Sequence, residues 1–271
     1  MTRITPLRPH RAWALTGLVL LGVSAGALAT GARATAAGSD PATTAITPIG
    51  RTSQSAVVAA RYHRPLAVKV VDAAGNPVGG ATVTFTLGSA ASESSAAAGA
   101  GATFSGGGAQ ATALTDAAGL AVSPLFTANT TAGRFTATAV AAGAAESVRF
   151  SLRNVAGKPA MLTPGVGSSQ STTAGTRFPV RLAVTVTDAH DNPVAGALVT
   201  FSVPVRGPRG SFISGLSGAR SRAARVRTDA AGVAVAPAFA ASAEEGGYIV
   251  RATVARATPA AFALVNARAS A

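Results

Sequence analysis

The chain has 271 residues, a formal net charge of +13 and no cysteine. The lack of cysteine excludes a disulfide framework, a zinc–thiolate site, an iron–sulfur cluster and a thiol nucleophile. Charged residues make up 12% of the chain, about half of the usual share of roughly 25%, and 48% of the residues are apolar. This composition excludes a charge-driven disordered chain and favours a packed interior.

The first 36 residues have the pattern of an export signal. Residues 1–11 carry arginines and no acid, and residues 12–29 contain no charge at all. This is typical of the n-region and h-region of a signal peptide, and small-x-small cleavage motifs follow. We therefore expect a signal peptide at 1–36, export through the general secretory route because no twin arginine is present, and an extracellular or cell-surface location. The alternative is an uncleaved membrane anchor, since a span needs about 20 apolar residues.

The rest of the chain contains one unit twice. Residues 53–87 align with residues 169–203 at a constant offset of 116, with 18 identities in 35 positions. A sequence period of this length indicates tandem domains of ordinary size. We therefore expect two domains, at 40–157 and 158–271, joined by a short hinge at Gly157-Lys158-Pro159.

Within each unit, apolar and polar residues alternate with a period of two, which is typical of strands with one buried face. In the first unit, Leu66, Val68 and Val70 form one such face, and Val83 and Phe85 form the next. Turn residues separate these segments, and no convincing helical periodicity is present. The pattern predicts an all-β fold of two tandem Ig-like antiparallel β-sandwiches, each with about seven short strands.

Two further features refine this prediction. Pro124 and the equivalent proline of the second unit interrupt a strand, and proline does not join a central ladder, so we expect a break there. The two tyrosines, Tyr62 and Tyr248, correspond to Phe178 and Phe135 in the other unit. This exchange of tyrosine for phenylalanine predicts buried rings rather than exposed binding residues.

The repeated pattern resembles a known family. The motif L-x-V-x-V-x-D-x-x-x-N-P-V-x-G-x-x-V-x-F spans Leu66–Phe85 and Leu182–Phe201, and T-D-x-x-G follows at Thr115–Gly119 and Thr228–Gly232. These motifs are similar to those of the bacterial immunoglobulin-like domain of group 1, the intimin/invasin repeat family. The resemblance implies an Ig-like sandwich that serves as a rigid extracellular segment, often in cell-surface adhesins.

No set of residues in the sequence suits catalysis. There is no activated serine motif, and one turn alone, Asp188 to Asn192, combines aspartates, a histidine and an asparagine. The equivalent turn of the first unit keeps only its aspartate and asparagine, and calcium needs six to eight oxygen ligands. We therefore expect a solvated turn, and we expect no metal, no cofactor and no enzymatic activity.

Six arginines in a stretch without an acid are the sharpest local feature. They raise the net charge of residues 158–271 to +7, against +2 for residues 37–157. Such a cluster suits an anionic surface, and the absence of interleaved aromatic residues argues against nucleic acid. The alternative is a solvated loop in an arginine-rich chain. The six residues are Arg206, Arg209, Arg220, Arg222, Arg225 and Arg227.

These observations predict a secreted or cell-surface, non-enzymatic structural or adhesion protein built of tandem bacterial Ig-like repeats. The expected partner is an anionic cell-envelope polymer or another surface protein, with no nucleic acid and no small-molecule substrate. A membrane would be a partner only if the leader is retained. The alternative function is a soluble ligand- or polysaccharide-binding module that uses the loops of the second sandwich.

Overall fold

The computed structural model describes residues 45–88, 99–215 and 217–269. These residues contain strands β1 to β21 and no helix, which confirms the predicted all-β class. Accordingly, no helix in the described part of the chain is long and apolar enough to span a membrane. The predicted signal peptide, 1–36, lies outside the described residues.

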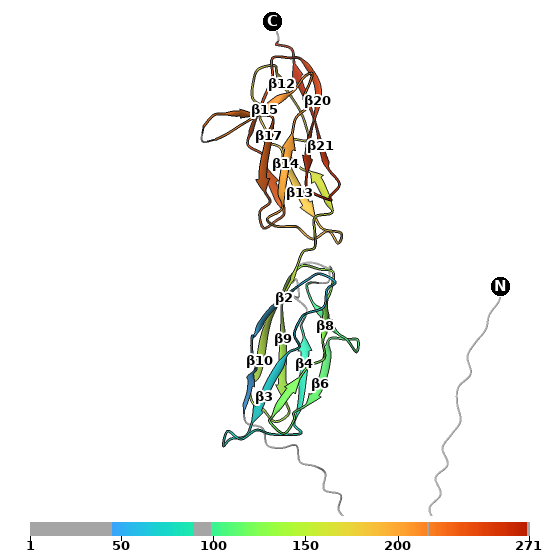
Figure 1. Cartoon of the computed structure of the whole chain (residues 1–271), viewed down its shortest axis with the longest axis vertical. Coiled ribbons are helices and arrows are strands. Elements are labelled where there is room, and N and C mark those ends of the chain that lie inside the picture. The colour runs from blue at the N-terminus through green and yellow to red at the C-terminus, as the bar shows by residue number, and fades with distance from the viewer. Residues whose placement is uncertain (1–44, 89–98, 216, 270–271) are drawn as a thin grey trace, which may run out of the picture. The chain divides into compact units, whose positions relative to one another are not determined.

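The strands of the first repeat, β1 to β10, form a five-stranded sheet of order β2-β10-β9-β4-β6, a three-stranded sheet of order β1-β3-β7, and a β5-β8 pair (Figure 1). Strand β2 runs parallel to β10, and the other pairs are antiparallel. The strands are β1 (Ala45–Pro48), β2 (Ser53–Val57), β3 (Ala67–Val71), β4 (Thr82–Leu87), β5 (Ala102–Phe104), β6 (Gln110–Leu114), β7 (Leu120–Val122), β8 (Phe126–Ala128), β9 (Gly133–Ala141) and β10 (Ser147–Val155).

The second repeat, β11 to β21, has the same order in its two larger sheets, β12-β21-β20-β14-β17 and β11-β13-β18. A three-stranded sheet of order β16-β15-β19 takes the place of the β5-β8 pair. Strand β12 again runs parallel to β21. In the described residues, the strands of one repeat pair only with strands of the same repeat. The strands are β11 (Met161–Pro164), β12 (Ser169–Thr173), β13 (Ala183–Thr187), β14 (Leu198–Ser202), β15 (Gly210–Ile213), β16 (Arg220–Ser221), β17 (Ala223–Arg227), β18 (Val233–Val235), β19 (Ala238–Ala241), β20 (Gly246–Thr253) and β21 (Ala260–Ala267).

Each repeat therefore has more strands than the seven or so that the sequence pattern predicts. The additional strands are short, such as β5 with three residues and β16 with two. They form in stretches rich in glycine, serine and alanine, where no alternation of apolar and polar side chains marks a strand. Pairing with neighbouring strands, β8 for β5 and β15 for β16, rather than local propensity, holds them extended.

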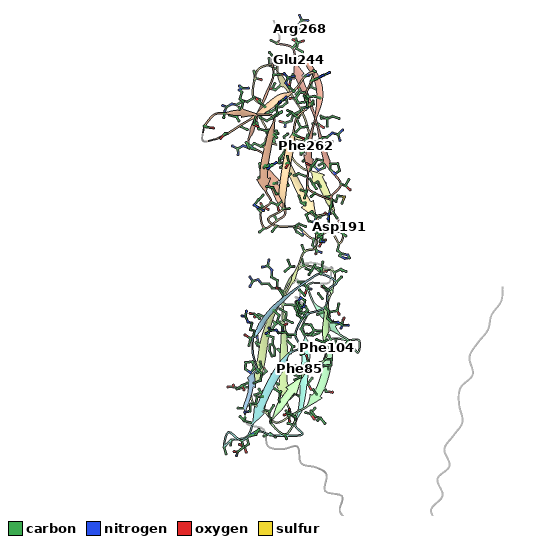
Figure 2. All side chains as sticks on the ribbon, in the orientation of Figure 1. Phe85, Phe104, Asp191, Glu244, Phe262 and Arg268 are labelled. Atoms are coloured by element: carbon green, nitrogen blue, oxygen red, sulfur yellow. The ribbon has the colours of Figure 1, made fainter. Side chains whose placement is uncertain are left out.

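Each repeat buries its own cluster of apolar side chains, one drawn from residues 46–152 and the other from residues 162–264. Figure 2 shows Phe85 and Phe104 within the first repeat and Phe262 within the second. All three rings are at most 3% exposed. The inward faces predicted from the alternation are confirmed: the fully buried residues include Leu66, Val68, Val70, Val83, Leu182, Val184, Val186, Val199 and Phe201.

Two prolines interrupt strands where the sequence predicts, and a glycine lies at a crossing between sheets. Pro124 lies between β7 and β8, and Pro237 lies between β18 and β19, so each interrupts a ladder that it cannot join. Between β1 and β2 the chain crosses from the three-stranded to the five-stranded sheet. Gly50 has a φ of +79° at this crossing, a conformation that glycine adopts without steric cost.

The T-D-x-x-G motif forms the same turn in both repeats. The Thr115 hydroxyl donates to Val78 O (2.6 Å) and accepts from Ala81 N (2.8 Å), and Thr228 makes the equivalent bonds. At Gly119, φ is +74°, and an added Cβ would lie 2.5 Å from the Val70 carbonyl oxygen. The motif thus satisfies buried backbone groups and permits a close approach of two chain segments.

The first repeat also has a buried polar centre. The Tyr62 hydroxyl donates to Asn154 Oδ1 (2.7 Å), and Asn154 Nδ2 donates to Gly101 O (2.8 Å). Burial raises the pKa of Tyr62 to about 12. Tyr62 is 1% exposed and Tyr248 is 8% exposed, so the predicted burial of both rings is confirmed.

Candidate functional site

The six arginines predicted from the sequence lie in three parts of the second repeat. Half of the stretch that carries them, residues 206–227, is strand. Within it, β17 pairs with β14 over five residues. Arg220, Arg225 and Arg227 therefore lie on strands rather than in a loop, and all three are exposed to solvent. Arg206 and Arg209 lie between β14 and β15, Arg220 lies on β16, Arg222 precedes β17, and Arg225 and Arg227 lie on β17.

Arg225 and Arg227 project from one face of β17, an edge strand of the five-stranded sheet, and both are exposed. Arg225 is opposite Thr200 of β14. Ser202, the next residue of β14 on the same face, is opposite Arg251 of β20. Arg251 therefore joins this face, which we call the β17 arginine face. The sequence alone did not indicate Arg251, because it lies outside the arginine-rich stretch.

Some of these guanidinium groups have partners. Arg209 Nη1 lies 3.9 Å from a carboxylate oxygen of Glu244, the one ion pair found among the described residues. Arg227 Nη1 donates to Gly196 O at 2.8 Å. Three of the predicted arginines, Arg206, Arg222 and Arg225, make no side-chain hydrogen bond or ion pair within the described part of the chain.

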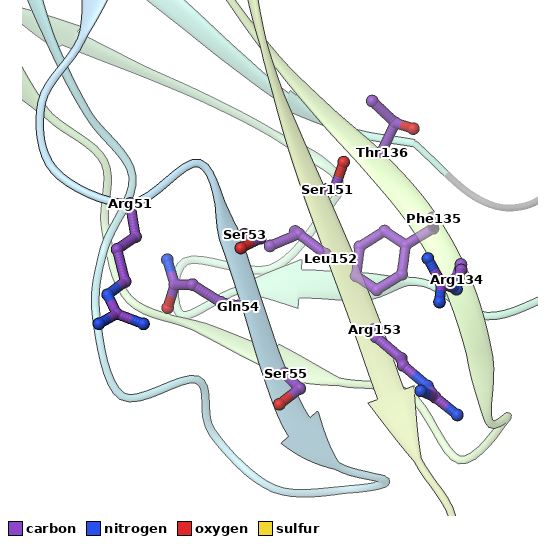
Figure 3. Close-up of a pocket in the computed structure, with 10 residues that line it drawn as sticks. All are labelled: Arg51, Ser53, Gln54, Ser55, Arg134, Phe135, Thr136, Ser151, Leu152 and Arg153. Carbon is purple, nitrogen blue, oxygen red and sulfur yellow. The ribbon is translucent and has the colours of Figure 1, made fainter.

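A second arginine-rich surface lies on the five-stranded sheet of the first repeat, where no sequence motif indicated a site. A pocket of about 660 Å³ opens there, and Figure 3 shows ten of its lining residues. Arg51 precedes β2, Arg134 lies on β9, and Arg153 lies on β10 directly opposite Arg134. We call these three residues the first-repeat arginine site. Only the strand register places Arg134 and Arg153 opposite each other, because they lie on different strands, and Arg51 lines the same pocket.

The sequence predicts a solvated turn from Asp188 to Asn192, but only the three middle residues of the turn are exposed. Asp188 is 3% exposed and Asn192 is 6% exposed, although His190 is exposed. Asp188 Oδ1 accepts hydrogen bonds from His190 N (2.8 Å) and Asn192 N (3.0 Å), and Oδ2 accepts one from Gly157 N (2.7 Å). The described residues contain no group of three or more histidine and acidic side chains suited to hold a metal ion.

The burial of this turn comes from contact with the loop between β8 and β9. Asn192 Oδ1 accepts from Ala132 N (2.7 Å), and Asn192 Nδ2 donates to Thr130 O (2.8 Å). The equivalent Asn76 of the first repeat is exposed and bonds within its own turn, with Asn76 N donating to Asp72 Oδ1 (2.8 Å). The turn therefore bonds only within itself at Asn76, whereas at Asn192 the same turn also bonds to the loop between β8 and β9.

The same hydrogen bonds set the acidity of these aspartates. Burial acts to raise the pKa of Asp188, but bonds from the Gly157 backbone N–H and the Asn192 side chain, among others, outweigh it, so the pKa lies below its usual value. The pKa of Asp72 is also lowered, chiefly by the backbone N–H of Asn76. Both groups are therefore more readily ionised in the folded chain.

Comparisons with protein-family models and with curated proteins find no match. Among solved structures, the chain is similar to FdeC, described as a broadly conserved Escherichia coli adhesin (19% identity, TM-score 0.41, covering 80% of this chain and 65% of that one). It is also similar to InvD of Yersinia pseudotuberculosis (15% identity, TM-score 0.49, covering 83% of this chain and 58% of that one). A further similar structure is invasin, described as a bacterial integrin-binding protein (20% identity, TM-score 0.34, covering 83% of this chain and 39% of that one). The chain spans less than two thirds of each of these structures.

The matched adhesin domains are of the kind that the repeated motifs resemble. The matches also include structures of glycoside-cleaving enzymes. One fold can support many functions, so these matches do not choose between functions.

Proposed function

We propose that this chain is a non-enzymatic adhesion protein of the cell surface, built from two Ig-like domains at 40–157 and 158–271. The observation that carries the proposal is the repetition itself: two sets of strands, each with its own buried cluster and with the same order in its two larger sheets. Such a repeat serves as a spacer that presents exposed surface to partners.

We assign the contact with an anionic envelope polymer to the arginines of the second repeat. On the β17 arginine face, three guanidinium groups lie over neighbouring strands, with Thr200 and Ser202 between them. All five acids of residues 158–271 lie outside the strands that form this face. Guanidinium groups bind phosphate and carboxylate through paired hydrogen bonds, so a polymer carrying either is a fitting partner.

The test measures retention of residues 37–271 on purified cell envelope at rising salt. We expect retention to fall steeply between about 0.05 and 0.5 M NaCl, because exposed charges are screened over these concentrations. The variant Arg225→Thr with Arg227→Leu copies Thr112 and Leu114, the equivalent residues of the first repeat, and should retain markedly less protein. A control with the same loss of charge is Arg177→Ser with Arg181→Ser. Equal losses in both variants would contradict the assignment.

Export and location are tested separately. We propose that residues 1–36 are a cleaved signal peptide and that the protein leaves the cell through the general secretory route. N-terminal sequencing of protein recovered from the culture medium should then begin within residues 29–37. Recovery only from membranes with an intact N-terminus would instead mean that the leader is retained as an anchor.

One observation favours the alternative function, glycan binding by loops of the second sandwich. A pocket of about 640 Å³ is lined by Pro204, Val205 and Arg206 of the loop after β14 and by Ile249 and Arg251 of β20. Tyr248, which also lines it, is largely buried and offers little surface for stacking on a sugar ring. A glycan array should decide: hits that Arg206→Ser abolishes would favour this function over envelope attachment.

A further inference from the structure

We propose that the first-repeat arginine site binds a polysaccharide that carries sulfate or phosphate groups. This site lies on a different repeat from the β17 arginine face, and the inference does not depend on the envelope contact assigned to that face. It rests on the strand register of β2, β10 and β9, on the charge of the patch, and on a comparison with the same positions in the second repeat.

The register places arginines and hydroxyls in two neighbouring rows on the outer face of the sheet. Strands lie about 4.8 Å apart and alternate outward residues about 6.6 Å apart, so the two rows form a patch roughly 10 Å across. All six side chains are exposed. One row is Ser55, Arg153 and Arg134, and the other is Ser53, Ser151 and Thr136.

The patch has an uncompensated positive charge. Arg153 and Arg134 are directly opposite each other, and like charges in this position destabilise a sheet. Neither side chain makes an ion pair or hydrogen bond with a described residue. Glu146, the acid next to β10, is seven residues from Arg153 along an extended chain, or about 23 Å. A bound anion would therefore relieve the repulsion that the protein leaves in place.

The second repeat shows that the fold does not need these charges. At the position of Arg153 it has Val265, and at the position of Arg134 it has Gly247, yet β20 and β21 pair in the same way as β9 and β10. The position of Arg51 is taken by Gly167. The arginine pair is thus a property of the first repeat alone and not a requirement of the sandwich.

The chemistry of the patch selects the class of ligand. Two adjacent guanidinium groups can each donate two parallel hydrogen bonds to a tetrahedral oxyanion, and hydroxyls beside them can bond to oxyanion or sugar oxygens. Figure 3 shows Arg51 on the other side of β2, where it adds a third positive charge to the pocket. Phe135 is among the lining residues, but it is 5% exposed and offers no platform on which a nucleic-acid base could stack.

The test compares dextrans of one length that differ only in their charged group. Binding of residues 37–271 to dextran sulfate, dextran phosphate, carboxymethyl dextran and neutral dextran is measured by calorimetry at about 0.1 M salt. We expect the sulfate or the phosphate form to bind, the tighter of the two identifying the group, and neutral dextran not to bind. Equal binding of carboxymethyl dextran would overturn the preference for tetrahedral oxyanions. Equally tight binding of oligothymidylate would overturn the choice of a polysaccharide.

Variants locate the site. Arg134→Ser with Arg153→Ser should weaken binding of the preferred dextran at least about 10-fold, since two charged hydrogen-bond donors are lost. Arg149→Ser is a control on the same strand that removes one charge: Arg149 projects outward but is opposite Thr138, and its loss should cost less than about 3-fold.

The thermal midpoint of the double variant should be equal to or above that of the unchanged chain, because the like-charge pair is gone. Unchanged affinity in this double variant, or an equal loss in Arg149→Ser, would overturn the proposal. If Arg225→Thr with Arg227→Leu abolishes dextran binding instead, the site proposed here fails while the envelope contact stands.

Discussion

The two repeats share their strand order but differ at the polar centre of the core. In the first, the Tyr62 hydroxyl donates to Asn154 Oδ1. In the second, Phe178 takes the place of Tyr62, and Asn266 Oδ1 is buried without a hydrogen-bond partner. The hydroxyl of Tyr248, whose counterpart in the first repeat is Phe135, is also buried without one.

The ring hydroxyl therefore occupies different positions in the two repeats: on Tyr62 in the first, and on Tyr248, the counterpart of Phe135, in the second. The rings still pack: Tyr62 stacks on Phe126 with centroids 4.5 Å apart, and Phe178 lies 5.5 Å from Phe239. The fold therefore depends on the aromatic volume at these positions more than on the hydrogen bond. An unpaired buried polar group costs about 1–3 kcal/mol, so we expect the polar centre of the second repeat to be the weaker one.

The largest expected effect tests whether the repeats are separate folding units. Phe85→Ala and Phe201→Ala each remove a fully buried ring at equivalent positions, and each should lower the free energy of unfolding by about 3–5 kcal/mol. Each substitution should shift only the transition of its own repeat in scanning calorimetry. A common transition that either substitution shifts as a whole would contradict two independent domains.

The second largest change in stability is expected at the polar centre of each repeat. Tyr62→Phe should lower stability by about 1–3 kcal/mol, because Asn154 Oδ1 loses its donor. Tyr248→Phe should leave stability unchanged or raise it, because its hydroxyl has no partner to lose. Phe178→Tyr should stabilise the second repeat by about 1 kcal/mol if the new hydroxyl reaches Asn266. Urea unfolding measures all three, and equal losses in both tyrosine variants would refute the comparison.

A smaller effect is expected at the paired turns. Asn192→Ala removes bonds to Thr130 and Ala132 and should cost about 1–2 kcal/mol of unfolding free energy. Asn76→Ala, at the equivalent but exposed position, should change stability by no more than about 0.5 kcal/mol. If the two substitutions cost the same in urea unfolding, the contact made by Asn192 adds nothing to stability.

The smallest expected effect is a dependence on pH. Because the pKa of Asp188 is lowered in the folded chain, its carboxylate stabilises the fold above the unfolded pKa of about 3.9, and this contribution is lost as the pH falls through the lower folded value. Unfolding free energies measured from pH 6 down to pH 2 should therefore fall less steeply for Asp188→Asn than for the unchanged chain. An identical slope would show that Asp188 does not contribute.

The sequence was sufficient to predict the all-β class, the long strands and the buried faces. Alternation around Phe85 and Phe201 marks the buried faces, because the side-chain period of a strand is fixed by its geometry. Turn residues and prolines such as Pro124 mark where strands end, for reasons that are local to the backbone. These features depend on neighbours in sequence, which is why one sequence was enough.

The arginine pair and the buried turn depend on neighbours in space. Arg134 and Arg153 face each other only through the register of β9 and β10, and no local motif records that register. Asn192 and Asn76 occupy the same motif, yet only Asn192 contacts a distant loop. For the predicted arginines, the sequence identified the charge correctly but not that strand pairing orders Arg225 and Arg227.

The parallel pairing of β2 with β10, and of β12 with β21, has a mechanical consequence. In each repeat, an early strand and the last strand lie side by side over five residue pairs and run in the same direction. Ladder hydrogen bonds lie across the strands, so tension that slides these two strands past each other loads the whole ladder at once instead of opening it bond by bond. Such a geometry resists stretching, a useful property for any chain held at one end and pulled at the other.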